Sequence, residues 1–450
     1  MMSGNKIFIF EFISGGGFNK EKIPSSLFCE GFAMLNSISS DFTKLDFEVH
    51  TLLDERIMHL SDYLQIEHFI PVDNRDNYLE IFKQGLGSCE SCFIIAPEFS
   101  DILYNLSSIA EKLKKKIISV NSEAIPIASS KLKTSDLFKK YSIPSPQTYF
   151  LPPEQKSLPP PTKDVQISSL SEKVGFPFII KPNDGVSAES VYFLKDKKKM
   201  NEFIKNWTNF LVPHRSYVLQ EYCPGRNLSA SLICPLLSKN HPFSEMEEKR
   251  KPLLLSINNQ DLQFKDISVD SQYFGGFTPV SDLVNVGSKF LKLLEHLDLS
   301  QTQSYIGIDF ILSQQREISF IEINPRLTTS YIGITNAFKE NPIDLLLNSQ
   351  EYTQDFIFSQ KNWGFSQFSR KELLYKGKKS VRHLNQNVIP KLLKKIPEFI
   401  TPPMSFGKKD MHDYVQFSCF LATSCKNKAE SIQRMQEIEE LLNNVQFYLL

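Results

Sequence analysis

The stretch that decides the fold lies near residue 322 and reads Phe320-Ile321-Glu322-Ile323-Asn324-Pro325-Arg326. An earlier apolar run, Tyr305 to Leu312, carries Asp309 in its middle. The polar residues 313–317 separate the two runs. Two β-branched, apolar runs joined by a short polar segment predict a β-hairpin.

Three polar side chains of this hairpin are expected on one face. If the turn is centred on residues 315–316, Asp309 lies opposite Glu322, and Asn324 shares the face of Glu322 because strand side chains alternate. Directly opposed Cβ atoms are about 5 Å apart. Two carboxylates and an amide oxygen suit Mg²⁺, which leaves coordination positions for water and nucleotide phosphates.

The alternative is a hairpin whose acids simply face solvent. That alternative leaves unexplained why Asn-Pro-Arg follows the second acid directly. Pro325 ends the strand because proline cannot donate to a ladder, and Arg326 at the strand end can bind an anion through two hydrogen bonds.

The pattern resembles the metal-binding end of the ATP-grasp superfamily of carboxylate–amine ligases. It consists of Gly307-x-Asp309-Phe310 followed by Glu-Ile-Asn-Pro-Arg. Motifs nearer the N-terminus, Phe10-Glu11-Phe12 with its glycine run and Leu53-Asp54-Glu55-Arg56, are similar to the branch of tyramine–glutamate ligases of methanofuran biosynthesis and their bacterial relatives. The resemblance implies ATP with Mg²⁺ or Mn²⁺, and metal ligands Asp309, Glu322 and Asn324.

Composition restricts the partners and the compartment. The chain has 450 residues, which predicts two to four domains. Its 51 basic and 51 acidic residues argue against a nucleic acid or membrane surface held by charge. No apolar run approaches ~20 residues, the N-terminus does not read as a signal peptide, and seven scattered cysteines fit reduced thiols, so we expect a cytoplasmic protein.

The N-terminal part alternates between strand-like and helix-like segments. Strands are expected at 7–13, 48–53, 92–97 and 117–120, and helices at 24–41 and 101–114. This alternation predicts an open parallel α/β sheet, which binds ligands at the carboxyl ends of its strands.

Substrate is expected at the first of these strand ends. The residues concerned are Glu11, Gly15, Gly16, Gly17 and Glu30. Backbone amides of the glycine turn suit a carboxylate, and either glutamate suits an ammonium group. Glu11→Gln should then raise the KM of the amino-acid or amine substrate more than that of ATP. The alternative is that the glycine turn is a structural corner.

The resemblance also implies the nucleotide contacts. Lys131, which opens a helix, and Lys181, which ends a strand, match the two lysines that meet the phosphates, and Ser187 lies in the loop over them. The hinge that reads adenine falls on Glu221 and Tyr222, and Asn227 is nearest to the ribose position. Arg326 would steady an acyl phosphate, with Lys181 as a second catalytic group. Thr328 and Thr329 resemble the substrate-side loop, although they could simply cap a helix.

We therefore expect an ATP-grasp fold, α/β in its first half and α+β in its catalytic half. The expected domains are a pre-ATP-grasp domain at 1–125, an ATP-grasp domain at 126–350 and a small β-rich domain with a closing helix at 351–450. Residues 151–173 are expected to be a Pro-rich loop or linker, and 236–251 a charged insertion.

The expected activity is ATP-dependent amide formation from a small-molecule carboxylate and an amine through an acyl phosphate. The first alternative is another ATP-grasp amino-acid or peptide ligase with a different amine, and the second is a non-catalytic ATP-binding regulatory protein. The intact metal residues and Arg326 disfavour the second, since binding alone would tolerate their loss. The resemblance also allows a homodimer.

Overall fold

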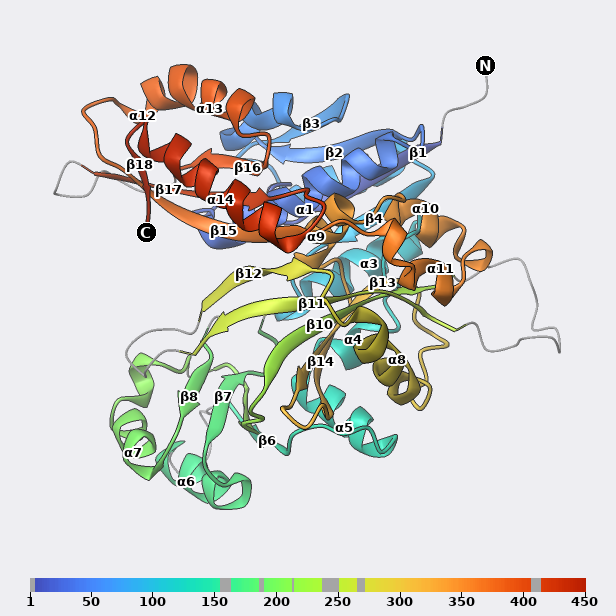
Figure 1. The fold of residues 1–450 in the computed structure, drawn as a ribbon, viewed down its shortest axis with the longest axis vertical. Coiled ribbons are helices and arrows are strands. Elements are labelled where there is room, and N and C mark those ends of the chain that lie inside the picture. Colours follow the sequence, from blue (N-terminus) through green and yellow to red (C-terminus); the bar gives the residue numbers. More distant parts are fainter. Residues whose placement is uncertain are drawn as a thin grey trace.

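A computed structural model describes most of the chain. It covers residues 5–153, 163–185, 190–212, 214–236, 251–264, 272–405 and 414–450. Ser187 and most of the expected insertion at 236–251 lie outside these residues. The described elements form three sheets, with helices on their outer faces (Figure 1).

The N-terminal sheet has five parallel strands in the order β3-β2-β1-β4-β5. Its strands are β1 (Lys6–Glu11), β2 (Glu48–Asp54), β3 (His68–Val72), β4 (Ser91–Ile95) and β5 (Lys116–Ile117). Its main helices are α1 (Ser25–Thr43), α2 (Tyr78–Ser88) and α3 (Ile102–Lys112). The predicted open parallel sheet is confirmed, although the sequence did not reveal β3, an edge strand that contains Pro71.

The second sheet is antiparallel, with the order β6-β9-β7-β8. Its strands are β6 (Thr148–Leu151), β7 (Phe178–Pro182), β8 (Tyr192–Leu194) and β9 (Tyr217–Glu221), and its helices are α6 (Lys163–Val174) and α7 (Lys197–Lys205). These elements form the lower left lobe of Figure 1 and enclose a small core of their own. The expectation of a loop over 151–173 is wrong for α6, because Ile167 and Ser171, one helical turn apart, are buried against the sheet.

The third sheet has nine strands and is the largest of the three described sheets. Its order is β14-β13-β10-β11-β12-β15-β17-β16, and β18 pairs with β15. The strands are β10 (Arg226–Cys234), β11 (Leu253–Gln263), β12 (Gln272–Thr278), β13 (Ser304–Leu312), β14 (Ile318–Asn324), β15 (Ser366–Tyr375), β16 (Phe399–Met404), β17 (Val415–Ala422) and β18 (Phe447–Leu449). The C-terminal strands thus extend the central sheet and also cover a second hydrophobic cluster beneath α13 (Ile389–Lys395) and α14 (Lys428–Asn443).

The remaining helices connect and flank these sheets. They are α4 (Ile125–Ala128), α5 (Lys131–Lys140), α8 (Leu283–Leu294), α9 (Ser330–Ala337), α10 (Pro342–Leu347), α11 (Gln354–Phe358), α12 (Val381–His383), α13 (Ile389–Lys395) and α14 (Lys428–Asn443). Short turns of helix are η1 (Glu55–Tyr63), η2 (Phe99–Asp101), η3 (Trp207–Asn209), η4 (Ser349–Glu351), η5 (Gln360–Asn362) and η6 (Leu384–Val388).

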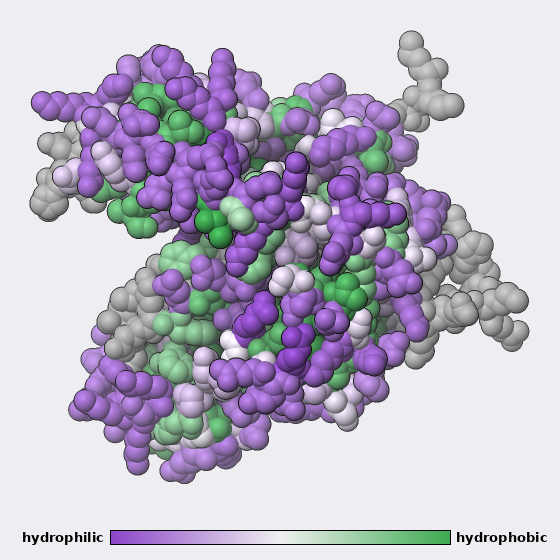
Figure 2. Space-filling model, viewed as in Figure 1, coloured by the Kyte–Doolittle hydropathy of each residue, from purple (hydrophilic) through white to green (hydrophobic). Residues whose placement is uncertain are grey.

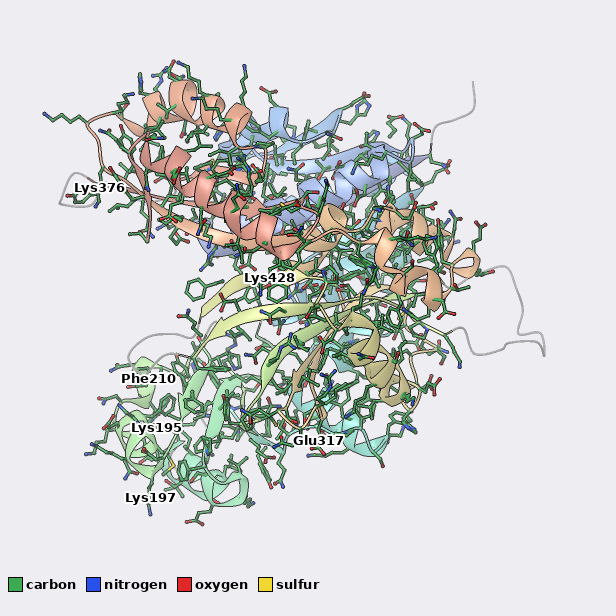
Figure 3. The ribbon with its side chains drawn as sticks, viewed as in Figure 1. Lys195, Lys197, Phe210, Glu317, Lys376 and Lys428 are labelled. Carbon is green, nitrogen blue, oxygen red and sulfur yellow. The ribbon has the colours of Figure 1, made fainter. Side chains whose placement is uncertain are left out.

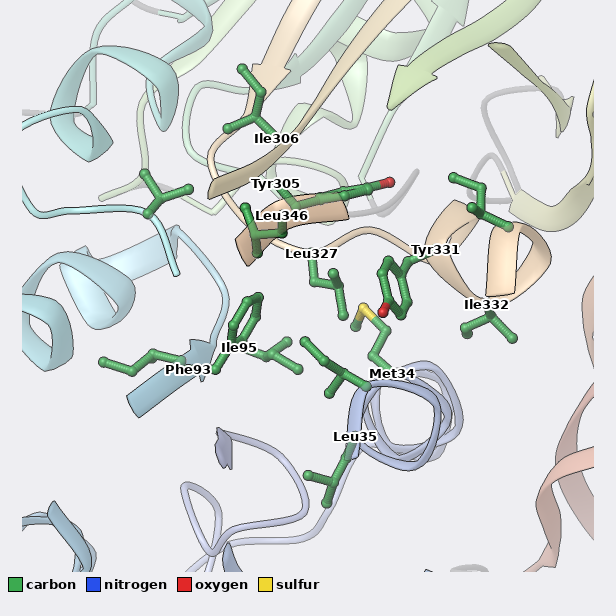
Figure 4. Packing of buried hydrophobic residues seen from close by; sticks show 14 of the residues in the cluster. Met34, Leu35, Phe93, Ile95, Tyr305, Ile306, Leu327, Tyr331, Ile332 and Leu346 are labelled. Carbon is green, nitrogen blue, oxygen red and sulfur yellow. The ribbon is translucent and has the colours of Figure 1, made fainter. Parts of the chain in front are cut away.

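One hydrophobic core joins the N-terminal sheet to the central sheet. Figure 4 shows Met34 of α1 and Ile95 of β4 packing toward Leu327 and Tyr331, which follow the β13–β14 hairpin. All four side chains are buried. This shared core fixes the carboxyl ends of the N-terminal strands against the hairpin.

The outer surface is mixed in character. In Figure 2 hydrophilic residues dominate the C-terminal helices and the lower lobe, whereas hydrophobic residues gather over the central strands between them. Figure 3 places Lys428 of α14 toward β12, and its Nζ lies 4.8 Å from the centroid of the Phe277 ring. Among the described residues, none of the helices has the length and apolarity needed to span a membrane.

Candidate active site

The β13–β14 hairpin has the predicted register. Asp309 pairs with Glu322, and Gly307 pairs with Asn324. Figure 3 labels Glu317 at the hairpin's turn, on the side of the molecule away from the N-terminal sheet. The strand-end amide of Asn324 donates a hydrogen bond of 3.2 Å to Asp309 Oδ2, so the three expected metal ligands lie together on one face.

Two lysines approach this face from separate elements. Lys131 is the first residue of α5, and Lys181 is the fourth residue of β7. Their Nζ atoms each lie 3.4 Å from Glu322 Oε2, and both side chains are buried. Lys131 also donates a 2.7 Å hydrogen bond to the carbonyl of Gly185, which ties the start of α5 to the loop after β7.

Burial and the two lysines set the charge of the carboxylate pair. Burial raises the pKa of Asp309, and the nearby Glu322 raises it further. Burial would also raise the pKa of Glu322, but the ammonium groups of Lys131 and Lys181 outweigh that effect and lower it. Burial lowers the pKa of Lys181, while Glu322 opposes that change. The site therefore holds one firmly ionised carboxylate and a second whose negative charge would be favoured by an added cation.

The donor set fits Mg²⁺. Asp309 and Glu322 offer carboxylate oxygens, and a half-turn of the Asn324 amide would offer a third oxygen. Gln260 Nε2 donates to Asp309 Oδ1 at 2.9 Å and holds that carboxylate in place. Gln260 was not anticipated from the sequence, because an isolated glutamine in a strand gives no signal of its own.

A cleft of about 1210 Å³ of empty volume, including open solvent at its mouth, contains these residues. Its lining comes mainly from β7 and β9 of the second sheet and from β10 to β14 of the central sheet. The cleft therefore lies between these two sheets. Of the expected site residues it is lined by Glu30, Lys131, Lys181, Glu221, Tyr222, Asn227, Asp309, Glu322, Asn324, Arg326, Thr328 and Thr329.

The hinge at the end of β9 differs from the expectation in one respect. The N–H of Glu221 donates to the carbonyl of Gln147 at 2.9 Å, and the N–H of Tyr222 donates to the carbonyl of Pro177 at 3.2 Å. These two N–H groups are therefore engaged within the protein and would not be available to a base edge. Cys223, the next residue, also lines the cleft and was not anticipated.

Arg326 joins the two halves of the site. Its Nε donates to Glu98 Oε2 at 3.0 Å, and its Nη1 donates to the carbonyl of Leu327 at 3.1 Å. Glu98 follows β4 at the carboxyl edge of the N-terminal sheet and is buried. Glu30 is close enough to contribute to the raised pKa of Arg326, although burial is the largest influence and acts in the opposite direction. Two acids of the N-terminal domain, Glu30 and Glu98, thus lie near the guanidinium at the end of the hairpin.

The loop after the hairpin is held by hydroxyl groups. Thr328 Oγ1 lies 2.9 Å from Tyr305 Oη, and Thr329 Oγ1 lies 3.0 Å from Tyr273 Oη. Burial raises the pKa of both tyrosines well above its usual value, so both remain protonated donors at neutral pH. Tyr273 also lines the cleft and was not among the residues expected there.

The first strand end does not contribute to this lining. The two carboxylate oxygens of Glu11 accept hydrogen bonds from the backbone N–H groups of Ile13 and Ser14, at 3.0 and 2.7 Å. The glycine turn packs on its neighbours instead, since a Cβ on Gly16 would lie 2.6 Å from Val72. The structure thus brings Glu30, but not Glu11 or Gly15 to Gly17, to the cleft.

Two family models match the chain. The pre ATP-grasp 3 domain covers residues 47–125, and the ATP-grasp domain covers residues 128–330. The chain belongs to the ATP-grasp superfamily. As expected from that membership, it is an enzyme of the ligase class with an ATP-binding fold.

Known proteins similar to this ATP-grasp chain include a ligase and several solved folds. The tyramine–L-glutamate ligase of Methanocaldococcus jannaschii is 26% identical over 344 residues, 75% of this chain and 85% of that protein. An ATP-grasp superfamily protein from Archaeoglobus fulgidus aligns with a TM-score of 0.54 and 20% identity, covering 92% of this chain and 99% of that one. The biotin carboxylase domain of the Hydrogenobacter thermophilus 2-oxoglutarate carboxylase, crystallised with MgADP and bicarbonate, aligns with a TM-score of 0.60 and 12% identity, covering 100% and 91%.

Proposed function

We propose that this protein joins the carboxylate of an amino acid to an amine, with ATP as the source of energy and an acyl phosphate as the intermediate. The observation that carries the proposal is the convergence of Lys131 and Lys181 on Glu322, in one cleft with Asp309 and Arg326. This arrangement supplies cations for a polyphosphate beside oxygen ligands for a divalent ion.

In the first step, an oxygen of the substrate carboxylate attacks the γ-phosphorus of ATP. The bond between that phosphorus and the bridging oxygen breaks, and ADP leaves. Lys131 and Lys181 would hold the phosphate oxygens and offset their charge, and burial of both lysines strengthens that effect. Asp309, Glu322 and Asn324 would hold Mg²⁺, which when bound would offset the negative charge of the phosphates.

In the second step, the neutral amine attacks the acyl carbon, the bond to phosphate breaks, and inorganic phosphate leaves. Arg326 would hold the acyl phosphate with the edge of its guanidinium that faces away from Glu98. The amine must lose a proton, and Glu30, which lines the cleft near Arg326, is our candidate acceptor. Placing both substrates beside the γ-phosphate is the chain's main contribution.

We further propose that the chain is divided functionally at 1–125, 126–350 and 351–450. The first part would supply substrate contacts through Glu30 and Glu98, and the second would hold the nucleotide, with the carbonyls of Glu221 and Tyr222 near the base and Asn227 near the ribose. The third part extends the central sheet. Ser187, which lies outside the described residues, remains a candidate for the phosphate loop.

The similarity to tyramine–L-glutamate ligase suggests glutamate and tyramine as the first substrates to test. The experiment measures ADP release over a matrix of amino acids and amines, and identifies the amide by mass spectrometry. Glutamate labelled with ¹⁸O in its carboxylates should transfer one ¹⁸O atom to inorganic phosphate. Release of unlabelled phosphate together with amide would contradict the acyl phosphate.

A different amine is the second candidate, because 26% identity does not fix the pocket that receives it. In that case glutamate would still give ¹⁸O-labelled phosphate with another amine of the matrix. Glu322→Gln is the control, since it should abolish ADP release with every pair. ADP release that survives in this variant would place the activity outside the described cleft.

A further inference from the structure

A second cluster of ligating side chains lies far from the cleft. Glu48 and His50 are on β2, and His68 begins β3. Glu48 and His50 are two residues apart and therefore share one face of the sheet, while His50 and His68 are paired directly across the two parallel strands. The cluster thus sits at the amino ends of the strands, at the edge opposite to Glu98 and the cleft.

The three side chains converge on one point. His50 Nε2 lies 2.8 Å and His68 Nε2 lies 3.1 Å from the same oxygen, Glu48 Oε1. One ligand atom from each residue lies within 4.8 Å of the other two. The two imidazole rings are stacked, with centroids 4.3 Å apart and an angle of 20° between their planes.

We propose that Glu48, His50 and His68 form a zinc site. Two imidazole nitrogens and one carboxylate oxygen are a known ligand set for Zn²⁺, with Zn–N distances of about 2.0–2.1 Å. A tetrahedral ion at those distances needs its ligands about 3.4 Å apart, so the observed separations of 2.8 and 3.1 Å require only a small expansion. The fourth position faces solvent and would hold water, because His68 is half exposed.

A simple hydrogen-bonded cluster is the competing interpretation. Lys6 Nζ also lies 3.0 Å from Glu48 Oε1, so three donors contact one carboxylate oxygen, and the side chains of this ion pair are 44% and 29% exposed. Exposed pairs of this kind contribute little to stability. A zinc ion would bind Glu48, His50 and His68 in place of the contacts that these side chains now make with one another. Lys6 would then compete with the ion for Glu48.

The proposed ion would act on structure and not on the chemistry in the cleft. β3 is the edge strand of the N-terminal sheet, and the ion would link it to β2. The seven residues of β2 span about 20 Å between this cluster and the strand's carboxyl end. Zinc binding should therefore stabilise the edge strand and leave ligase turnover unchanged.

The test uses the full-length protein stripped of metal with EDTA and titrated with Zn²⁺ by calorimetry in excess Mg²⁺. We expect one ion per chain at micromolar concentration or tighter, and a rise in Tm. His50→Gln and His68→Gln keep an amide that can donate to Glu48 but lose the nitrogen ligand, so each should weaken binding at least ~10-fold and abolish the rise in Tm. His59→Gln, an exposed histidine of the same domain, is the matched control and should bind as the wild type does.

Lys6→Met keeps all three proposed zinc ligands but removes the ammonium group that competes with the ion for Glu48. This variant should therefore bind Zn²⁺ more tightly than the wild type. Co²⁺ in place of Zn²⁺ should give the absorption of a four-coordinate ion in the wild type and lose it in His68→Gln. The proposal is overturned if the wild type binds no stoichiometric zinc, if both histidine variants bind as it does, or if Lys6→Met binds more weakly.

Discussion

At the scale of single residues, position relative to the cleft separates two lysines that the sequence alone does not distinguish. Lys131 and Lys133 lie two residues apart on α5, yet Lys131 is buried against Glu322 and Lys133 is exposed. Lys131→Met should raise the KM for ATP and lower kcat/KM by about 10²-fold, because the proposed nucleotide site would lose one of its two cations. Lys133→Met should change neither. Steady-state kinetics with ATP varied makes the comparison, and equal effects in both variants would remove Lys131 from the nucleotide site.

Glu11 has a structural role that the sequence did not reveal. Burial raises its pKa to about 7 from 4.5, although the N–H groups of Ile13 and Ser14 oppose the shift. Between these two values the folded state holds a proton that the unfolded chain has released. The free energy of unfolding therefore falls as the pH rises through this window, by up to ~3 kcal/mol from this one group.

Glu11→Gln should remove its share of this pH dependence, because the amide does not titrate, and leave the share of Asp309, whose pKa burial also raises. Urea denaturation at a series of pH values measures it, with the exposed Glu21→Gln as the control. The variant's KM values for ATP, acid and amine should stay near those of the wild type, since Glu11 does not line the cleft. A slope as steep as that of the wild type would show that Glu11 does not contribute to the pH dependence in this window.

At the scale of elements, the buried carboxylate of Asp41 links helix α1, which packs on the N-terminal sheet, to helix α9, which packs on the central sheet. Asp41 of α1 accepts hydrogen bonds from the hydroxyl of Tyr331 at 2.7 Å and from that of Thr335 at 2.8 Å. Tyr331 follows the loop that carries Thr328 and Thr329. The contact therefore fixes one wall of the cleft from a distance.

Asp41→Ala should lower the free energy of unfolding by about 3–5 kcal/mol, because the buried hydroxyl of Tyr331 and the half-buried hydroxyl of Thr335 lose their acceptor. Thr335→Val removes one of the two bonds and should cost about 1–2 kcal/mol. Chemical denaturation measures both. If Asp41→Ala cost no more than Thr335→Val, the bond to Tyr331 would contribute nothing and the link between the two helices would be weaker than the geometry indicates.

The elements also show where sequence reasoning succeeds. The β13–β14 register followed from one polar turn and the alternation of side chains, both of which are local, and the structure confirmed it. The edge strand β3 and helix α6 were missed because Pro71 and a Pro-rich flank obscured short segments that are defined by their packing. Gln260 and Tyr273 were missed as cleft residues for a related reason, since only tertiary structure brings β11 and β12 over Asp309.

At the scale of the whole molecule, the cleft is completed by an ion pair between two sheets. Glu98 comes from the N-terminal sheet and is buried, and Arg326 comes from the end of the hairpin and keeps 14% of its side chain exposed. Among the described residues, Nη2 of Arg326 has no hydrogen-bond partner, which leaves that atom for an anion. The pair could therefore serve stability, catalysis or both, and the two roles make different predictions.

A double-mutant cycle separates these roles. Arg326→Met leaves the Glu98 carboxylate buried without its partner and should cost about 3–5 kcal/mol of stability. Glu98→Gln should cost less, because its amide oxygen still accepts from Arg326. The double variant contains neither charge, so it should recover part of the stability that Arg326→Met loses. Turnover should not follow stability. Arg326→Met and the double variant should both lose about 10²-fold or more in kcat, whereas Glu98→Gln should keep most of it, because in the proposed mechanism only the guanidinium would contact the acyl phosphate. Urea denaturation and steady-state kinetics on the same four proteins provide the two readouts. If the double variant regained turnover together with stability, Arg326 would be a link between the sheets and another cation would have to hold the acyl phosphate.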